Sequence, residues 1–179
     1  EGSLVQTTYV PDDNFEQALI DLGYDDAMDD YVLTANISGV TSLDVKYESI
    51  SDLTGIEDFT SLEILHCNNN QLTSLDVSSN TALTELRCHV NQLTSLDLSN
   101  NAALDYLLCY NNQLTALDVS NNLMLTDLSC GSNELTTMDF STNTALTFLS
   151  VRDNALTTLN VSANTALTSL SCQNNQLTT

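Results

Sequence analysis

Basic residues are almost absent from this chain. Its only lysine and arginine residues are Lys46, Arg87 and Arg152, against 24 aspartates and glutamates, and its formal net charge is −21. Proteins that bind nucleic acid need clustered lysine and arginine to neutralise phosphates, and anionic membranes attract proteins through the same residues. The composition therefore excludes nucleic acid as a partner and disfavours an anionic membrane surface. Such acidity mainly keeps a protein soluble, with divalent-cation binding or a saline habitat as alternative explanations.

Long apolar runs and the usual catalytic patterns are also missing. No stretch approaches the roughly 18 consecutive apolar residues of a membrane-spanning helix, so membrane insertion is not expected. Histidine is limited to His66 and His89, and the sequence contains neither a phosphate-binding loop nor a G-x-S-x-G motif. The two histidines could share a metal ion, but a third ligand at good geometry is not obvious. We therefore expect a protein that is not an enzyme.

The sequence is instead dominated by a 21-residue repeat that runs in register from residue 62 onward. With Leu62 as position 1, the unit reads L-x-x-L-x-C-x-x-N-x-L-x-x-L-x-V-S-x-N-x-A. A fixed period of this kind is typical of a stacked array, because each unit buries its apolar side only against its neighbours. The asparagine row at position 9 is expected to satisfy loop backbone groups, and it comprises Asn70, Asn91, Asn112, Asn133, Asn154 and Asn175.

The first eleven positions of the unit resemble the leucine-rich repeat pattern L-x-x-L-x-L-x-x-N/C-x-L. With cysteine at an inward position, the repeat is similar to the short 21-residue type of internalin-like bacterial surface proteins and of secreted Bacteroidetes proteins. The resemblance covers about two thirds of the chain. It implies an α/β fold, a leucine-rich repeat solenoid with one parallel β-sheet on its concave face. It also implies a protein that is secreted or displayed on the cell surface of a bacterium.

The cysteines all stand at position 6, which Val151 occupies in one unit. Parallel strands stack about 4.8 Å apart, and residues one period apart point the same way, so their Cβ atoms do not face each other as a disulfide requires. Free cysteine behaves as a small buried hydrophobe. We expect a ladder of buried thiols, formed by Cys67, Cys88, Cys109, Cys130 and Cys172.

Two parts of the chain are distinguished by the repeat. Residues 1–39 do not follow it and are predicted to form an N-terminal helical cap, which covers the open end of the first strand. Residues 40–179 are predicted to form the repeats: one 22-residue unit, then 21-residue units, of which the last is incomplete.

A helix is expected in the cap. Asp13 and Glu16 suggest a capping box, and Phe15, Leu19 and Leu22 suggest an apolar stripe. A second helical turn is expected near residues 26–33.

No cofactor is expected, with calcium as the alternative. The cap of internalins resembles a reduced EF-hand, and the chain has an acidic cluster there at Asp25, Asp26, Asp29 and Asp30. The cluster lacks the glycine and the final glutamate of a calcium loop, which favours a solvated acidic loop. A row of aspartates at position 15 raises the same alternative, although backbone amides would satisfy these carboxylates equally well.

Strand alternation separates the scaffold from a variable surface. Positions 4 and 6 point into the core, so positions 3, 5 and 7 form outward triplets on the sheet. The triplets vary between units and contain all three cations and both histidines. Exposed aromatics with arginine are typical of binding hot spots, and Gly131 is expected to leave a notch beside Tyr110. The candidate ligand-binding residues are Arg87, His89, Tyr106, Leu108, Tyr110, Phe148 and Arg152.

These observations predict an extracellular binding or adhesion module that recognises a protein or glycan through the concave sheet face. The alternative is a structural spacer or surface-array repeat with no ligand of its own, because exposed strand positions favour aromatics in any case. The sequence stops within a repeat that has no polar terminal unit, so end-to-end self-association is expected there as a further possibility.

Overall fold

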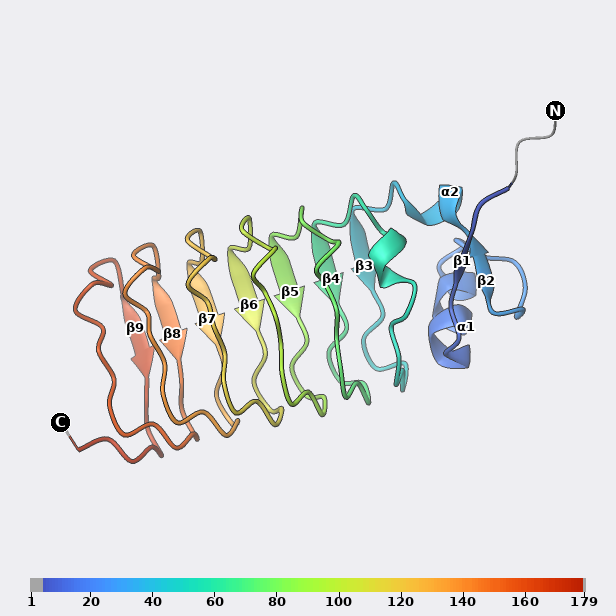
Figure 1. The fold of residues 1–179 in the computed structure, drawn as a ribbon. Coiled ribbons are helices and arrows are strands. Elements are labelled where there is room, and N and C mark those ends of the chain that lie inside the picture. Colours follow the sequence, from blue (N-terminus) through green and yellow to red (C-terminus); the bar gives the residue numbers. More distant parts are fainter. Residues whose placement is uncertain (1–4, 179) are drawn as a thin grey trace.

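The computed structural model describes residues 5–178, which form one row of stacked coils with a cap at the N-terminal end (Figure 1). Each coil contributes one short strand to the same side of the row, and the chain returns along the other side. The cap contains β1 (Thr7–Tyr9), α1 (Asp13–Asp21), β2 (Tyr31–Leu33) and α2 (Thr34–Ile37). The coils contain β3 (Ser42–Asp44), a 3-10 turn (Ile56–Asp58), β4 (Ile64–His66), β5 (Glu85–Arg87), β6 (Tyr106–Leu108), β7 (Asp127–Ser129), β8 (Phe148–Ser150) and β9 (Ser169–Ser171).

The strands β3 to β9 form one parallel sheet in sequence order. Pairing follows the repeat: Leu65 lies opposite Leu86, and Leu86 lies opposite Leu107. Between β3 and β4 the offset is one residue longer, since Leu43 pairs with Leu65. The prediction of a leucine-rich repeat solenoid with a single parallel sheet is confirmed.

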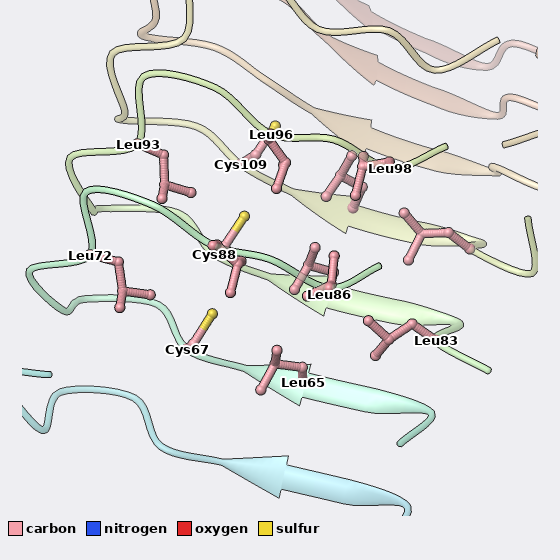
Figure 2. Packing of buried hydrophobic residues seen from close by; sticks show 14 of the residues in the cluster. Leu65, Cys67, Leu72, Leu83, Leu86, Cys88, Leu93, Leu96, Leu98 and Cys109 are labelled. Carbon is pink, nitrogen blue, oxygen red and sulfur yellow. The ribbon is translucent and has the colours of Figure 1, made fainter. Parts of the chain in front are cut away.

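Leucine and cysteine rows fill the inside of the coils (Figure 2). The cysteine thiols at position 6 are unpaired, and the first four are fully buried, as is Val151 in the same row. Burial disfavours the thiolate and raises the pKa of Cys88 and of Cys130 to about 12. The predicted ladder of buried thiols is confirmed. Its last member, Cys172, is only partly buried.

The valine in this row leads to a direct test of the cysteine position. We expect Cys109→Val to change the free energy of unfolding by less than about 1 kcal/mol, because Val151 already fits the equivalent place. Cys109→Ser should lower it by about 1–3 kcal/mol, because a buried hydroxyl then lacks a hydrogen-bond partner. Urea unfolding of both variants measures the difference, and equal stability would show that the row is not a dry apolar stack.

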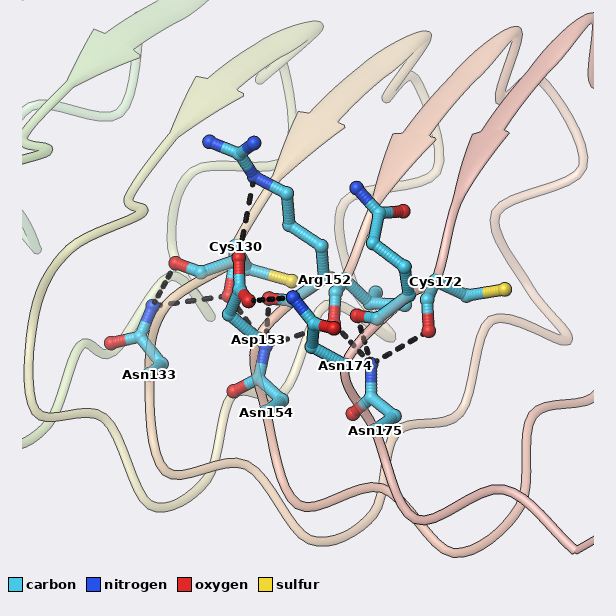
Figure 3. A network of polar contacts seen from close by, with 11 residues as sticks. Cys130, Asn133, Arg152, Asp153, Asn154, Cys172, Asn174 and Asn175 are labelled. Carbon is cyan, nitrogen blue, oxygen red and sulfur yellow. Dashed lines mark hydrogen bonds and ion pairs between the residues drawn. The ribbon is translucent and has the colours of Figure 1, made fainter.

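The predicted asparagine row at position 9 joins each coil to the one before it. The Nδ2 atom of Asn91 donates to the carbonyls of Cys67 (3.0 Å) and Cys88 (3.1 Å), and its Oδ1 accepts from the amide of Leu72 (3.0 Å). Figure 3 shows the same contacts at the other end of the array, around Asn154 and Asn175. The expected scaffold role of this row is confirmed.

A second asparagine row, at position 19, was not recognised as structural from the sequence. Its side chains are buried, and each Nδ2 donates to carbonyls of the preceding coil, as Asn101 does to Val77 (3.1 Å) and Asn80 (3.0 Å). These contacts fix the turn that leads into the next strand. The row comprises Asn80, Asn101, Asn122, Asn143 and Asn164.

The cap is a helix combined with a small antiparallel sheet, which the sequence analysis did not predict. β1 and β2 pair with Thr8 opposite Val32. The helical turn expected near residues 26–33 is wrong, because part of that segment is strand β2 and the short helix follows it at Thr34–Ile37. None of the helices within residues 5–178 is long and apolar enough to cross a membrane.

The predicted capping box in the cap is also wrong. Asp12, not Asp13, is the N-cap of α1, and its Oδ1 accepts from the amides of Asn14 and Phe15 at 3.0 Å. Glu16 instead accepts from the amide of Asp29 and so holds the following loop (2.8 Å). The stripe that buries Phe15, Ala18 and Leu19 does not extend to Leu22, which is exposed because α1 ends at Asp21 and Leu22 is its C-cap.

Candidate functional site

The outward residues of the seven strands and the residues at position 7 form one surface, called here the sheet face. In β4 to β7 the middle residue is buried and its two neighbours are half-buried, as alternation predicts. Of the predicted site residues, Arg87, Tyr106, Leu108, Tyr110 and Phe148 are half-buried and Arg152 is exposed.

The sheet face differs in charge from the rest of the molecule. It carries three carboxylates, Asp44, Glu85 and Asp127, and all three lysine and arginine residues of the chain. Its fixed charges therefore cancel, while the other 20 of the 23 carboxylates within residues 5–178 lie elsewhere, where these residues include no lysine or arginine. A ligand that meets the sheet face avoids the negative field of the remaining surface at close range.

A chain of polar contacts crosses β3, β4 and β5. His66 Nε2 lies 2.8 Å from Glu85 Oε1, and Arg87 Nε donates to the same oxygen at 2.6 Å. Lys46 Nζ pairs with Asp44 Oδ2 at 2.7 Å. Burial alone would raise the pKa of Asp44, but hydrogen bonds and charge from Lys46 outweigh it and lower the pKa below its usual value. The register of β3, β4 and β5 brings these side chains onto neighbouring strands, and their pairing depends on rotamers that the repeat does not fix.

Aromatic contacts continue the same surface from β5 to β6. The guanidinium carbon of Arg87 lies 5.3 Å from the centroid of the Tyr106 ring, within the range of a cation–π contact. The rings of His89 and Tyr110 stack with centroids 4.4 Å apart and an interplanar angle of 18°. The structure therefore joins Arg87, His89, Tyr106 and Tyr110 in two stacked pairs.

His89 corrects one prediction, because it is buried and not exposed. Only 9% of its surface is accessible. The following residue in every regular unit is left-handed, with φ of 52–57°, so the chain bends directly after position 7. Burial, together with the charges of Arg87 and His66, lowers the pKa of His89. We assign it a supporting role under Tyr110 instead of direct ligand contact.

The notch predicted at Gly131 is also corrected. A Cβ atom at this glycine would lie 2.9 Å from Cγ of Arg152 and 2.9 Å from the Arg152 carbonyl oxygen. The arginine stem therefore fills the space beside the glycine. Glycine is needed here for the close approach of the next coil, not to open a notch for a ligand.

Phe148 and Arg152 lie apart from the other predicted site residues. They belong to β8 and the residues after it, and β7 separates them from β6. β7 contributes small or acidic outward residues, Asp127 and Ser129. The structure thus gives a continuous aromatic and charged group on β5 and β6 and a second, smaller group two strands away.

The aspartate row at position 15 lies on the side away from the sheet. Each carboxylate accepts from the amide of the serine two residues later, as Asp97 does from Ser99 (2.9 Å). The backbone and hydroxyl hydrogen bonds of that serine lower the pKa of Asp97. Backbone amides thus satisfy the row, as the sequence allowed. Within residues 5–178, no three His, Cys, Asp or Glu side chains are grouped so as to hold a metal ion.

Comparison with known proteins relates the chain to internalins. Over 73 residues it is 43% identical to Internalin J of Listeria monocytogenes, a match that covers 41% of this chain and 8% of that protein. No protein-family profile matches the sequence.

Solved structures extend the relation to the whole chain. The functional domain of InlJ from Listeria monocytogenes, described as including a cysteine ladder, aligns with 97% of this chain at 34% identity and a TM-score of 0.63. The alignment covers 49% of that domain, so the present chain spans about half of it. An internalin, InlF, from the same species aligns with 96% of this chain and 58% of its own at 23% identity and a TM-score of 0.74, which supports the fold alone.

Proposed function

Because the chain is an internalin-like leucine-rich repeat protein with cysteine-bearing repeats, we propose that it is a binding or adhesion module acting outside a bacterial cell. Its sheet face recognises a protein or glycan ligand, with β5 and β6 at the centre. The observation that carries this proposal is that Arg87 contacts the ring of Tyr106 and pairs across the sheet with Leu108, with Tyr110 two residues further along the same coil. Repeated scaffold contacts do not require aromatic residues at these positions, since β9 has serine at both of its outward positions.

The charge distribution supports the choice of surface. Electrostatic repulsion from a molecule with a net charge of −21 opposes most acidic partners. The sheet face is the part of the molecule where positive and negative side chains balance. Tyrosine and arginine there supply a large contact area and charged hydrogen bonds, the composition of interface hot spots. Both histidines are engaged by neighbouring side chains of the sheet face: His66 contacts carboxylates, and His89 stacks on Tyr110.

A ligand screen with a matched triple variant tests this function. The chain is screened against recombinant surface proteins and against a glycan array, and each hit is repeated with Tyr106→Ala, Tyr110→Ala and Phe148→Ala combined. We expect a loss of affinity of about thirtyfold or more, because truncating anchors in a binding surface removes about 2 kcal/mol or more. A control variant, Thr94→Ala on the side away from the sheet, should bind as the parent does.

The spacer alternative makes the opposite prediction. If the chain only separates other domains, no protein or glycan in the screen binds, and the triple variant differs from the parent in nothing but a small change in stability. Circular dichroism and thermal unfolding of each variant distinguish lost binding from lost folding.

A further inference from the structure

One exposed apolar pair breaks the repeat without serving the fold. Leu123 and Met124 are 55% and 61% exposed at the turn before β7. The same two positions carry only small or polar residues in every other unit: Thr60-Ser61, Thr81-Ala82, Ala102-Ala103, Thr144-Ala145 and Thr165-Ala166. Large apolar side chains are therefore not a requirement of this position.

The backbone of the turn confirms that the scaffold does not need them. The amide of Leu125 donates to the carbonyl of Asn122 at 3.2 Å, and the corresponding bond from Leu146 to Asn143 is also 3.2 Å long. The turn thus has the same closing hydrogen bond with Leu-Met as with Thr-Ala. Neither packing nor backbone geometry requires the two large apolar side chains, so they are available for contact with a ligand.

The stacking of the coils places this pair in a larger apolar area. The Nδ2 atom of Asn122 donates to the carbonyl of Asn101 (2.9 Å), and that of Asn143 donates to the carbonyl of Asn122 (3.0 Å), so the three turns lie side by side. The neighbouring turns present small side chains that leave Leu123 and Met124 standing above them. We call this area the rim patch: Ala102, Ala103, Leu123, Met124 and Ala145.

Two carboxylates, Asp105 and the sheet-face residue Asp127, lie close to the rim patch in sequence. The hydroxyl of Thr126 is within hydrogen-bonding distance of the carboxylates of both Asp105 and Asp127, at 3.1 Å from Asp127 Oδ2. Asp127 is the first residue of β7, flanked on the sheet by Tyr106 and Phe148. From residue 88 to residue 151 the chain has no lysine or arginine. The rim patch is thus an apolar area with an acidic border, adjacent to the predicted binding residues.

We propose that the rim patch extends the binding surface of the sheet face and that its ligand is a protein with an apolar side chain next to a lysine or arginine. This inference rests on the function proposed above and narrows the ligand to a protein. Flexible aliphatic side chains such as leucine and methionine adapt to apolar protein surfaces, whereas sugar rings pack on aromatic faces. The two carboxylates complement a basic neighbour and repel an acidic one.

The test uses a displayed random-peptide library as the probe. Peptides are selected on the parent chain, synthesised, and measured by interferometry against Leu123→Thr combined with Met124→Ala, which restores the Thr-Ala of other units. We expect the selected peptides to contain large apolar and basic residues. Their affinity should be at least about tenfold lower for the Leu123→Thr, Met124→Ala variant than for the parent. Asp105→Asn combined with Asp127→Asn should lower the affinity for these peptides and make that affinity less dependent on salt. Thr165→Ala, at the same turn two coils away, is the matched control.

The other outcomes separate this inference from the proposed function. If the selected peptides bind the Leu123→Thr, Met124→Ala variant as tightly as the parent, the role of the rim patch is refuted. The proposed function still holds if the same peptides lose affinity for the triple variant of Tyr106, Tyr110 and Phe148. If no peptide is selected but the chain binds a glycan on the array, the role of the rim patch is also refuted, and the proposed function still holds. If nothing binds the chain at all, both fail.

Discussion

Replacing Asn112 by alanine is expected to lower the free energy of unfolding by about 3 kcal/mol or more. The side chain donates to the carbonyls of Cys88 (3.1 Å) and Cys109 (3.0 Å) and accepts from the amide of Leu93 (3.0 Å). Alanine removes all three hydrogen bonds and leaves the Leu93 amide without a partner, while the carbonyls of Cys88 and Cys109 keep one donor each, from Asn91 and Asn133. Each lost hydrogen bond contributes about 1 kcal/mol, and the unsatisfied amide adds a desolvation cost. Urea unfolding followed by circular dichroism measures the change.

Two controls make this result specific. Gln113→Ala alters the exposed neighbour and should change stability by no more than about 0.5 kcal/mol. Asn175→Ala removes the same three hydrogen bonds in the terminal coil, where it bonds Val151, Cys172 and Leu156. Its effect should be smaller, because water reaches the half-exposed end of the array. Equal effects of Asn112→Ala and Gln113→Ala would refute the structural role of the row.

Replacing Asp12 by alanine should also lower the free energy of unfolding by about 3 kcal/mol. Besides capping α1, its Oδ2 accepts from the amide of Ser51 (2.9 Å), the hydroxyl of Ser51 (2.7 Å) and the amide of Asp52 (3.0 Å). One carboxylate thus joins the cap to the first coil. Asp13→Ala, at an exposed position in the first turn of the same helix, is the matched control and should change stability by less than about 1 kcal/mol.

The contribution of Asp12 should depend on pH. Burial opposes ionisation of its carboxyl, but the hydrogen bonds from Ser51, Phe15 and Asp52 outweigh burial and lower its pKa below the usual 3.8. A lowered folded-state pKa stabilises the fold above 3.8, and this stabilisation is lost as the pH falls through the folded value. The difference between the parent and Asp12→Ala should therefore shrink below pH 3.8. A constant difference down to the acid limit would show that the charge of Asp12 is unimportant.

The repeat made most of the array predictable from the sequence. A strict period places residues one unit apart on adjacent strands, so Leu65 and Leu86 had to pair, and Cys67 and Cys88 had to point the same way. The second asparagine row was overlooked although it is just as regular. Asparagine before a turn is common for local reasons, and only the structure shows that Asn101 donates a hydrogen bond to the coil before it.

The structure of the cap and of parts of the site could not be predicted from the sequence, because these parts lack this periodicity. Asp12 bonds residues about forty positions away, and neither Ser51 nor Asp52 signals that contact in the sequence. On the sheet face, the sequence placed Arg87 and Tyr106 in one group of candidate residues, but the contact of the Arg87 guanidinium with the Tyr106 ring is diagonal between β5 and β6 and depends on the rotamer of Arg87. The period could not show that the chain bends after position 7, and so it did not foresee that His89 is buried or that Arg152 fills the space beside Gly131.

Repeated residues hold the fold, and we propose that the irregular residues of the sheet face bind a ligand. The most direct test gives β6 the outward residues of β9, as Tyr106→Ser, Leu108→Ser and Tyr110→Gln, and titrates parent and variant by calorimetry with the ligand found in the screen. We predict that the variant keeps a cooperative unfolding transition and loses affinity at least about thirtyfold. A folded variant that binds the ligand as tightly as the parent would contradict the account.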